Sequence, residues 1–222
     1  MELFECIETR ASKRDFKDTP VPRELIDKIL RASLRAPSWV NSQPWEIAVS
    51  TGRTSDFIKQ KMTELTKAGK KREDCVYFPL PEVWPDRQLE NMSETGKLIY
   101  ESMSVLRDDK KRREEIVLHN VNFFGSGTAI FIYIDEKLGL WSILDCGMLV
   151  QNILLCAHAE GLGACPQAIL VSYPDVLREA FKLPSGKKFL LGISIGYYKK
   201  ESPVNAVRTP RVLPEKIIKY YE

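Results

Sequence analysis

The segment TAIFIYIDEKLGLWSILDCGMLVQNILLCAHAEGLGACPQ, residues 128–167, decides the fold. It opens with TAIFIYI, an unbroken run of apolar residues that is typical of a buried strand. The stretch from Trp141 to Glu160 is apolar around its whole circumference and is followed by Gly161, so we expect a long helix that stops there. A helix without a polar face must be covered on every side, in the centre of the protein or at an oligomer interface.

Further helices and strands are predicted on both sides of this segment. The spacing of apolar residues predicts helices within residues 1–9, 22–35, 54–67, 90–106, 108–122 and 172–184, with Pro22 at a first helical position and Ser172 as a cap. Apolar alternation predicts a strand over 45–49, and KFLLGISIGY predicts a buried one. Because helices and strands do not alternate regularly, the pattern indicates an α+β fold rather than a doubly wound parallel sheet.

The chain is long enough, at 222 residues, for one domain with a large core. We therefore predict a single domain over residues 1–222, with a lid or insert at about 70–110. The first part of that insert is rich in proline and contains three aromatic residues, Tyr77, Phe78 and Trp84. Long irregular segments in compact domains are often lids or binding loops, and a hydrophobic patch that pins the insert down is the alternative.

Composition and charge exclude several classes of protein. A net charge of +3 is too small to indicate binding to nucleic acid or to a membrane surface. The opening MELFECIETR is acidic and has no apolar run, so we expect no signal peptide, no membrane segment and a cytoplasmic location. The five cysteines contain no C-x-x-C pair, which favours reduced, mostly buried thiols.

Several familiar catalytic motifs fail on inspection. FFGSGTAIF has no Lys-Ser/Thr after its glycines, and GLGAC has no third glycine, so neither is a nucleotide-binding loop. The two histidines, His119 and His158, have no partner at metal-ligand spacing. We therefore predict no metal site and no catalytic side chain, and enzymes of this kind often rely on the reactivity of a cofactor.

Two basic clusters lie near opposite ends of the chain. The first contains Arg10, Ser12, Lys13 and Arg14, and the second contains Arg208 and Arg211. Guanidinium groups together with a hydroxyl are what a phosphate monoester needs, although such clusters also occur on ordinary solvated surfaces.

The order and spacing of longer motifs point to one family. TRASKRDF, then APSWVNSQPWEIAV, then GLGACPQAILVSYPDVLREAFKLP, LGISIGY and SPVNAVRTPR follow one another along nearly the whole chain outside 70–110. This succession resembles the nitroreductase-like flavoproteins. The resemblance implies a central, mostly antiparallel sheet surrounded by helices, an intertwined homodimer, and flavin mononucleotide (FMN) bound between the two subunits.

The resemblance also implies which residues bind FMN. They are Arg10, Ser12, Arg14, Pro37, Ser38, Trp39, Asn41, Asn120, Gln167, Ala168, Arg208 and Arg211. Arg10, Ser12 and the two C-terminal arginines match the phosphate site, and Arg14 matches a contact to the polar edge of the ring. The loop with Trp39 matches the part of the family's fold that the partner subunit places against the flavin. Asn120 matches a contact to the ribityl chain. Gln167 and Ala168 match the stretch whose backbone N–H donates to the redox nitrogen of the flavin. The sequence departs from the family's pattern at two places. Gln167 and Ala168 stand where many relatives have an acidic residue and a glycine, and Gly-Ser-Gly stands at 125–127 in place of the run found in close relatives.

The reaction implied is two-electron, ping-pong hydride transfer from NADH or NADPH to nitroaromatics, quinones or similar small acceptors. Three alternatives stay open on the sequence. They are a flavoenzyme of the same fold with other chemistry (reductive dehalogenation, flavin fragmentation or dehydrogenation), a flavin-binding module without turnover, and a basic helical binder of nucleic acid.

Overall fold

The computed structural model describes residues 1–70 and 81–222. Its α-helices are α1 (Leu3–Thr9), α2 (Arg23–Ser33), α3 (Gly52–Lys67), α4 (Asp86–Ser102), α5 (Lys110–Val121), α6 (Leu140–Ala159), α7 (Pro174–Phe181) and α8 (Pro203–Ala206). Its strands are β1 (Glu46–Ser50), β2 (Thr128–Asp135), β3 (Gly163–Gln167) and β4 (Lys187–Gly196). The predicted α+β class is confirmed.

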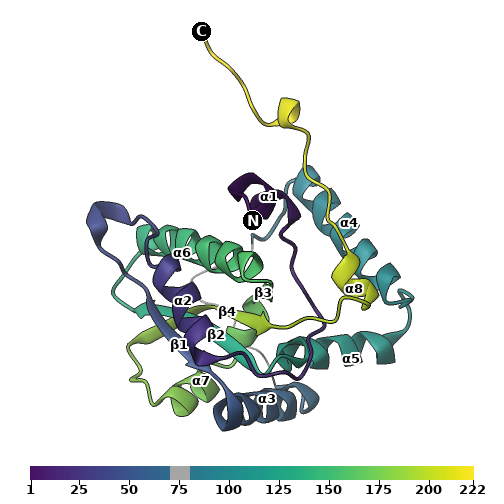
Figure 1. The fold of residues 1–222 in the computed structure, drawn as a ribbon. Coiled ribbons are helices and arrows are strands. Elements are labelled where there is room, and N and C mark those ends of the chain that lie inside the picture. The colour runs from purple at the N-terminus through teal and green to yellow at the C-terminus, as the bar shows by residue number, and fades with distance from the viewer. Residues whose placement is uncertain (71–80) are drawn as a thin grey trace.

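The four strands form one antiparallel sheet in the order β1-β2-β4-β3. Helices α2 and α6 cover one face of the sheet, and α3 and α7 cover the other, as Figure 1 shows. Each face therefore has its own hydrophobic core. Helices α4 and α5 lie beside the sheet, and the C-terminal segment runs past α4 and away from the body of the subunit (Figure 1).

Strand β2 shows why the run TAIFIYI is apolar at every position. Ile130, Ile132 and Ile134 point into the core beneath α6, whereas Phe131 and Tyr133 point into the core beneath α3 and α7. Successive side chains of a strand face opposite sides, so a sheet covered on both faces needs apolar residues throughout.

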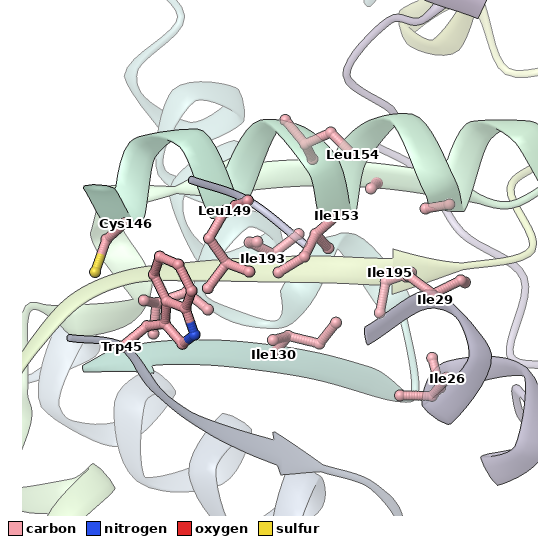
Figure 2. Close-up of a cluster of buried hydrophobic side chains, with 14 of the residues drawn as sticks. Ile26, Ile29, Trp45, Ile130, Cys146, Leu149, Ile153, Leu154, Ile193 and Ile195 are labelled. Atoms are coloured by element: carbon pink, nitrogen blue, oxygen red, sulfur yellow. The ribbon is translucent and has the colours of Figure 1, made fainter. Parts of the chain in front are cut away.

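Helix α6 packs across β2 and β4 with one face only. In Figure 2, Leu149 and Ile153 point from α6 toward Ile130 and Ile193 of the sheet. The opposite face leaves Trp141 and Leu144 largely exposed in the single subunit. We predicted that this helix is covered on every side. Within one chain the sheet covers only one side of α6, so the prediction is only half met.

By length and composition, α6 is also the one helix among the described residues that passes a simple test for a membrane-spanning helix. Helices at the core of globular proteins pass the same test, and only a third of its apolar window, 33%, is buried inside the subunit. Its exposed face is therefore not accounted for by packing within the subunit.

Most predicted helices and strands are present, with corrections at their ends. Pro22 is the residue before α2 rather than its first residue, and α7 is preceded by Tyr173, with Pro174 at the first helical position. Ser172 was wrongly predicted as the cap, because it already belongs to the turn that follows Ala168–Val171. Helix α4 begins at Asp86, earlier than predicted, and Pro85 immediately precedes it. Residues 123–127, which are not a nucleotide-binding loop, form a tight turn with Gly125 at a φ of 84°.

The four described cysteines are free thiols, and three of them are buried, as predicted. Of the three aromatic residues expected in a lid, Tyr77 and Phe78 lie outside the described residues. Trp84 lies just before α4 and is half-buried.

Candidate functional site

The candidate site begins with an extended segment, residues 10–17, which we call the N-terminal strap. The strap bridges to the edge strand β3 between Ser12 and Ala164 and to the chain after β4 between Phe16 and Tyr198. The backbone N–H of Lys13 donates to the carbonyl of Ala164 over 3.1 Å. The basic residues of the strap are thereby held along the outer edge of the sheet.

Asn205, a residue that the sequence analysis did not single out, ties the strap to the C-terminal segment. Its side-chain oxygen accepts from the backbone N–H of Arg14 over 2.6 Å. Its side-chain nitrogen donates to the carbonyls of Asp15 and Lys199 over 2.7 and 2.9 Å. Asn205 is 3% exposed, so these bonds are made away from water and are costly to lose.

Arg10 and Arg211, from the two segments joined by Asn205, lie within electrostatic range of each other. Burial lowers the pKa of the Arg10 guanidinium, and the positive charge of Arg211 lowers that pKa further. The hydroxyl of Ser12 is hydrogen-bonded to the thiol of Cys165, whose pKa is raised by burial and lowered in smaller part by the charges of Arg14 and Arg10. The charges of the two basic clusters therefore act on each other within one subunit.

Lys13 is the most deeply buried cation of the cluster, with 5% of its surface exposed. Its ammonium group donates to the backbone carbonyl of Asn205 over 2.8 Å and lies 4.7 Å from the centre of the Tyr198 ring. Burial, assisted by the charge of Arg208, lowers its pKa to about 8. A Cβ atom at Gly163 would come within 2.8 Å of the Lys13 side chain, so the glycine provides the space that the lysine occupies.

None of the five cations Arg10, Lys13, Arg14, Arg208 and Arg211 forms an ion pair with a carboxylate among the described residues. Burial is the main cause of the lowered pKa values of Arg10 and Lys13, and the unpaired like charges of Arg211 and Arg208 lower them further. The arrangement fits a group that carries at least two negative charges, as a phosphate monoester does.

His158, on the last turn of α6, belongs to the same cluster. Its ring nitrogen Nε2 lies 2.9 Å from the hydroxyl oxygen of Thr9. Burial lowers the pKa of His158, and the charges of Lys13, Arg10 and Arg208 lower it further. In the sequence His158 had been weighed only as a metal ligand, and no pattern places it beside residues 10–13, because the contact arises from packing of α1 on α6.

The strap also reaches the end of α5, where a second group of polar residues lies. Atom Nε2 of His119 lies 3.2 Å from the carbonyl oxygen of Arg14. One residue further, Asn120 receives two hydrogen bonds from the side chain of Gln167. The structure thus brings together Asn120 and Gln167, which lie far apart in sequence, while Ala168 is exposed at the start of the turn after β3.

The loop with Pro37, Ser38, Trp39 and Asn41 lies elsewhere in the subunit. The backbone N–H of Trp39 is 3.2 Å from both carboxylate oxygens of Asp145, near the start of α6, whereas Thr9 contacts His158 near its end. Thirteen residues of helix separate those two positions, or about 20 Å at a rise of about 1.5 Å per residue. Within one subunit, this loop and the cation cluster cannot contact the same small group.

The loop itself has a specific conformation and a large exposed surface. Val40, Asn41 and Gln43 have positive φ angles, and the hydroxyl of Ser38 accepts from the backbone N–H of Gln43 over 3.0 Å. The side chain of Trp39 is 62% exposed. A turn that is fixed internally while it holds a tryptophan in solvent is typical of a surface that contacts another molecule.

No group of three or more histidine, cysteine or acidic residues that would hold a metal is found within residues 1–70 and 81–222.

Comparison with known proteins identifies the family. The model of the Nitroreductase family matches residues 7–197. The chain belongs to the nitroreductase family. The matched range contains the strap, Asn120 and Gln167, and it ends before Arg208 and Arg211.

Individual members of the nitroreductase family align along the whole chain. The protein named 4-nitrobenzoate reductase from Pseudomonas putida is 30% identical over 212 residues, which cover 94% of this chain and 91% of that relative. Chloronitrobenzene nitroreductase from Comamonas testosteroni is also 30% identical, with 95% and 92% covered. The crystal structure of the FMN and NADPH-dependent nitroreductase NfnB from Sphigopyxis sp. strain HMH superposes with a TM-score of 0.95 at 28% identity, and each chain is covered completely. The nitroreductase fold is thereby confirmed.

Proposed function

We propose that this protein is an FMN-dependent oxidoreductase that uses NADH or NADPH to reduce nitroaromatic compounds, quinones or similar small acceptors. The names of its relatives support the reaction, because they include reductases of 4-nitrobenzoate and chloronitrobenzene and an FMN and NADPH-dependent nitroreductase.

The observation that carries the proposal is the meeting of unpaired cations from both ends of the chain. The charge of Arg211 acts on Arg10, and Lys13 and Arg208 both donate to the carbonyl of Asn205, while none of the four has a carboxylate partner among the described residues. A phosphate group there would relieve the mutual repulsion of these charges and accept hydrogen bonds from Ser12 and the guanidinium groups. We assign the phosphate of FMN to this region.

When bound, FMN supplies the chemistry, namely two-electron transfer from a nicotinamide donor to an acceptor in two half-reactions. The chain's own residues position the cofactor. On the strap, Arg10 and Ser12 would hold the phosphate and Arg14 would contact the ring, while Asn120, Gln167 and Ala168 would provide polar groups at the other end of the strap. No side chain is required as a nucleophile or as a general acid, so we assign no catalytic residue.

We further propose that the functional unit is a homodimer. The loop containing Pro37, Ser38, Trp39 and Asn41 is about 20 Å along α6 from the cation cluster of its own subunit, so it would complete the site of a second subunit. The exposed face of α6 supplies an apolar surface for that contact, with Leu144 56% exposed. The C-terminal segment, which extends away from the subunit in Figure 1, contributes the exposed residues Leu213, Ile217 and Tyr220.

We propose that the segment of about 70–110 is an insert of the single domain 1–222 and covers the site. The described part of the segment includes α4, which contacts α8 of the C-terminal region. A shallow cavity of about 190 Å³ lies between α4 and the segment with Arg211 and Leu213. The insert is therefore adjacent to the proposed phosphate site.

A cytoplasmic location is also proposed. In support, α6 packs on the sheet through Leu149 and Ile153 and carries the buried carboxylate of Asp145, which accepts from the Trp39 backbone. A buried, hydrogen-bonded carboxylate suits a core helix rather than one that faces lipid.

The absorbance spectrum of the purified protein, reconstituted with FMN, tests the function. We expect bound flavin that is bleached by NADH or NADPH and reoxidised by a nitroaromatic compound or a quinone. Protein that takes up no flavin would refute the assignment. Bound flavin that neither donor reduces would favour another reaction of the same fold or a module without turnover.

A further inference from the structure

Three polar side chains from three different elements form a chain of hydrogen bonds beneath the candidate site. Ser194 on β4 donates its hydroxyl to the side-chain oxygen of Gln167 at the end of β3. The side-chain nitrogen of Gln167 donates to Asn120 on α5 twice, to its backbone carbonyl over 2.9 Å and to its side-chain oxygen over 2.6 Å. Ser194 has no exposed surface and Gln167 is 5% exposed.

The chemistry of these groups leaves one orientation for each amide. The backbone carbonyl of Asn120 can only accept, so the group of Gln167 that faces it must be the nitrogen. Both hydrogens of that nitrogen are then used, and the oxygen of Gln167 faces the Ser194 hydroxyl. The side-chain oxygen of Asn120 is consequently occupied, and its nitrogen remains as a donor with no acceptor among the described residues.

The hydroxyl of Ser194 has no other hydrogen-bond partner in the described part of the chain. Its strand neighbour across the β2–β4 ladder is Ala129, so a small apolar side chain is accommodated at the same level of the sheet. An alanine at position 194 would therefore preserve the strand and remove only the bond to Gln167. A hydroxyl in this fully buried place has a more specific role than filling space.

We infer that Ser194 is a positioning residue that acts through Gln167 to make Asn120 present only N–H donors to the cofactor. The inference rests on the proposed function, because it assigns the ligand of Asn120 as an oxygen acceptor of FMN, a ribityl hydroxyl or a ring carbonyl. The position of Asn120 supports it, since the preceding residue, His119, contacts the strap at Arg14.

Without Ser194, the oxygen of Gln167 would be buried with no donor, which costs free energy. Rotation of the Gln167 amide would restore no bond, because it would turn an oxygen toward the carbonyl of Asn120. The amide would instead move, and the side chain of Asn120 would lose its fixed orientation. Because the FMN contact assigned to Gln167 itself is made by its backbone, the effect of Ser194 on FMN should depend on the side chain of Asn120.

A double-mutant cycle tests this dependence, using the dissociation constant of FMN measured by fluorescence and the visible spectrum of bound FMN. We expect Ser194→Ala and Asn120→Ala each to raise the dissociation constant about three- to tenfold and to change the spectrum in the same way. The double variant should bind no more weakly than Asn120→Ala alone. The control is Ser33→Ala on α2, which removes an equally buried hydroxyl bonded to the Ile29 carbonyl and should change neither readout.

Two results would overturn the inference while leaving the proposed function intact. One is wild-type affinity and spectrum in Ser194→Ala, and the other is a double variant whose loss is the sum of the two single losses. Melting temperatures of the four proteins show whether each variant is folded. Should Ser194→Ala not fold, Gln167→Leu removes the same link from its middle and is expected to match Asn120→Ala. A wild-type protein that binds no FMN would instead refute the proposed function itself.

Discussion

The ammonium group of Lys13 donates a hydrogen bond of 2.8 Å to the backbone carbonyl of Asn205, a residue 192 positions further along the chain. This contact joins two segments from opposite ends of the polypeptide, and the charge of Arg211 in the second segment acts on Arg10 in the first. A buried cation satisfied by a neutral carbonyl rather than by a carboxylate is costly in the free protein. The same cation becomes favourable once an anion binds beside it, so the subunit is arranged for a charged ligand.

Removal of one phosphate contact should weaken FMN binding without unfolding the protein. We expect Arg211→Ala to weaken binding by roughly 1 to 3 kcal/mol, because a charge-assisted hydrogen bond to the phosphate is lost. The dissociation constant, measured by flavin fluorescence, is the readout. Lys67→Ala on α3, across the sheet from this site, is the control and should bind as the wild type does. Unchanged binding in Arg211→Ala would remove this residue from the site.

Lys13 predicts an unusual pH dependence of stability in the FMN-free protein. Its pKa falls from 10.5 to about 8 on folding, so between those values the unfolded chain holds a proton that the folded chain has released. Since stability rises with pH wherever the unfolded state binds more protons, this group adds stability from about pH 8 to 10.5 and imposes its full cost below pH 8.

Lys13→Met should remove that cost. We expect the free energy of unfolding at pH 7 to rise by about 1 to 3 kcal/mol in the FMN-free protein, and the difference from wild type to shrink toward pH 10. Urea unfolding of both proteins at several pH values measures it, with Lys67→Met as the exposed control. The same variant should bind FMN more weakly. A difference that stays constant from pH 7 to pH 10 would contradict the role given to the Lys13 charge.

Asn205 is buried and joins two distant segments, so it should be important for stability. Asn205→Ala leaves the N–H of Arg14 and the carbonyls of Asp15 and Lys199 without their partner, which predicts a loss of about 2 to 4 kcal/mol in the free energy of unfolding. Denaturant titration is the measurement. Asn205→Asp is the informative companion, because it keeps the acceptor for Arg14 and loses both donors. Near-wild-type stability in both variants would mean that the strap is held by its backbone bridges alone.

The exposed face of α6 predicts a dimer that a single charge would disrupt. Leu144→Lys should convert the protein to monomers and lower FMN affinity at least tenfold, since the loop with Trp39 would no longer complete the partner's site. Light scattering after size-exclusion chromatography, combined with FMN titration, measures both effects. Leu106→Lys, at another exposed leucine, should remain dimeric. A wild-type monomer that binds FMN fully would refute the shared site.

Those parts of the fold were predictable that depend on the pattern of apolar residues within one strand or helix. The apolar composition of TAIFIYI and of the α6 stretch predicts that both are buried, because a strand or helix covered by other elements needs apolar residues on the covered faces. The order β1-β2-β4-β3 was not predictable, since strand pairing joins segments far apart in sequence. The exposed side of α6 was not distinguishable from its buried side, because both are apolar.

Some residues of the candidate site were likewise predictable from the sequence, and others were not. Arg10, Ser12, Arg14, Arg208 and Arg211 stood out as basic clusters, and the loop with Trp39 was identified through a family resemblance. Asn205, His158, Asp145 and Ser194 carried no signal, because an asparagine, a histidine, an aspartate or a serine acquires its role only from the groups packed against it. His158 illustrates this, since its neighbours come from α1, the strap and the C-terminal segment.

The sequence by itself determined a buried strand, a long apolar helix and two sets of cations placed near opposite ends of a chain with an α+β fold. Only the tertiary structure decided that the charges of Arg10 and Arg211 act on each other, and that the loop with Trp39 lies near the opposite end of α6 from the cation cluster. The physical reason is the range of the forces involved. Hydrophobic periodicity reflects contacts of residues that are close in sequence. Two like charges repel each other, so their approach requires the packing of the sheet and the hydrogen bonds of Asn205.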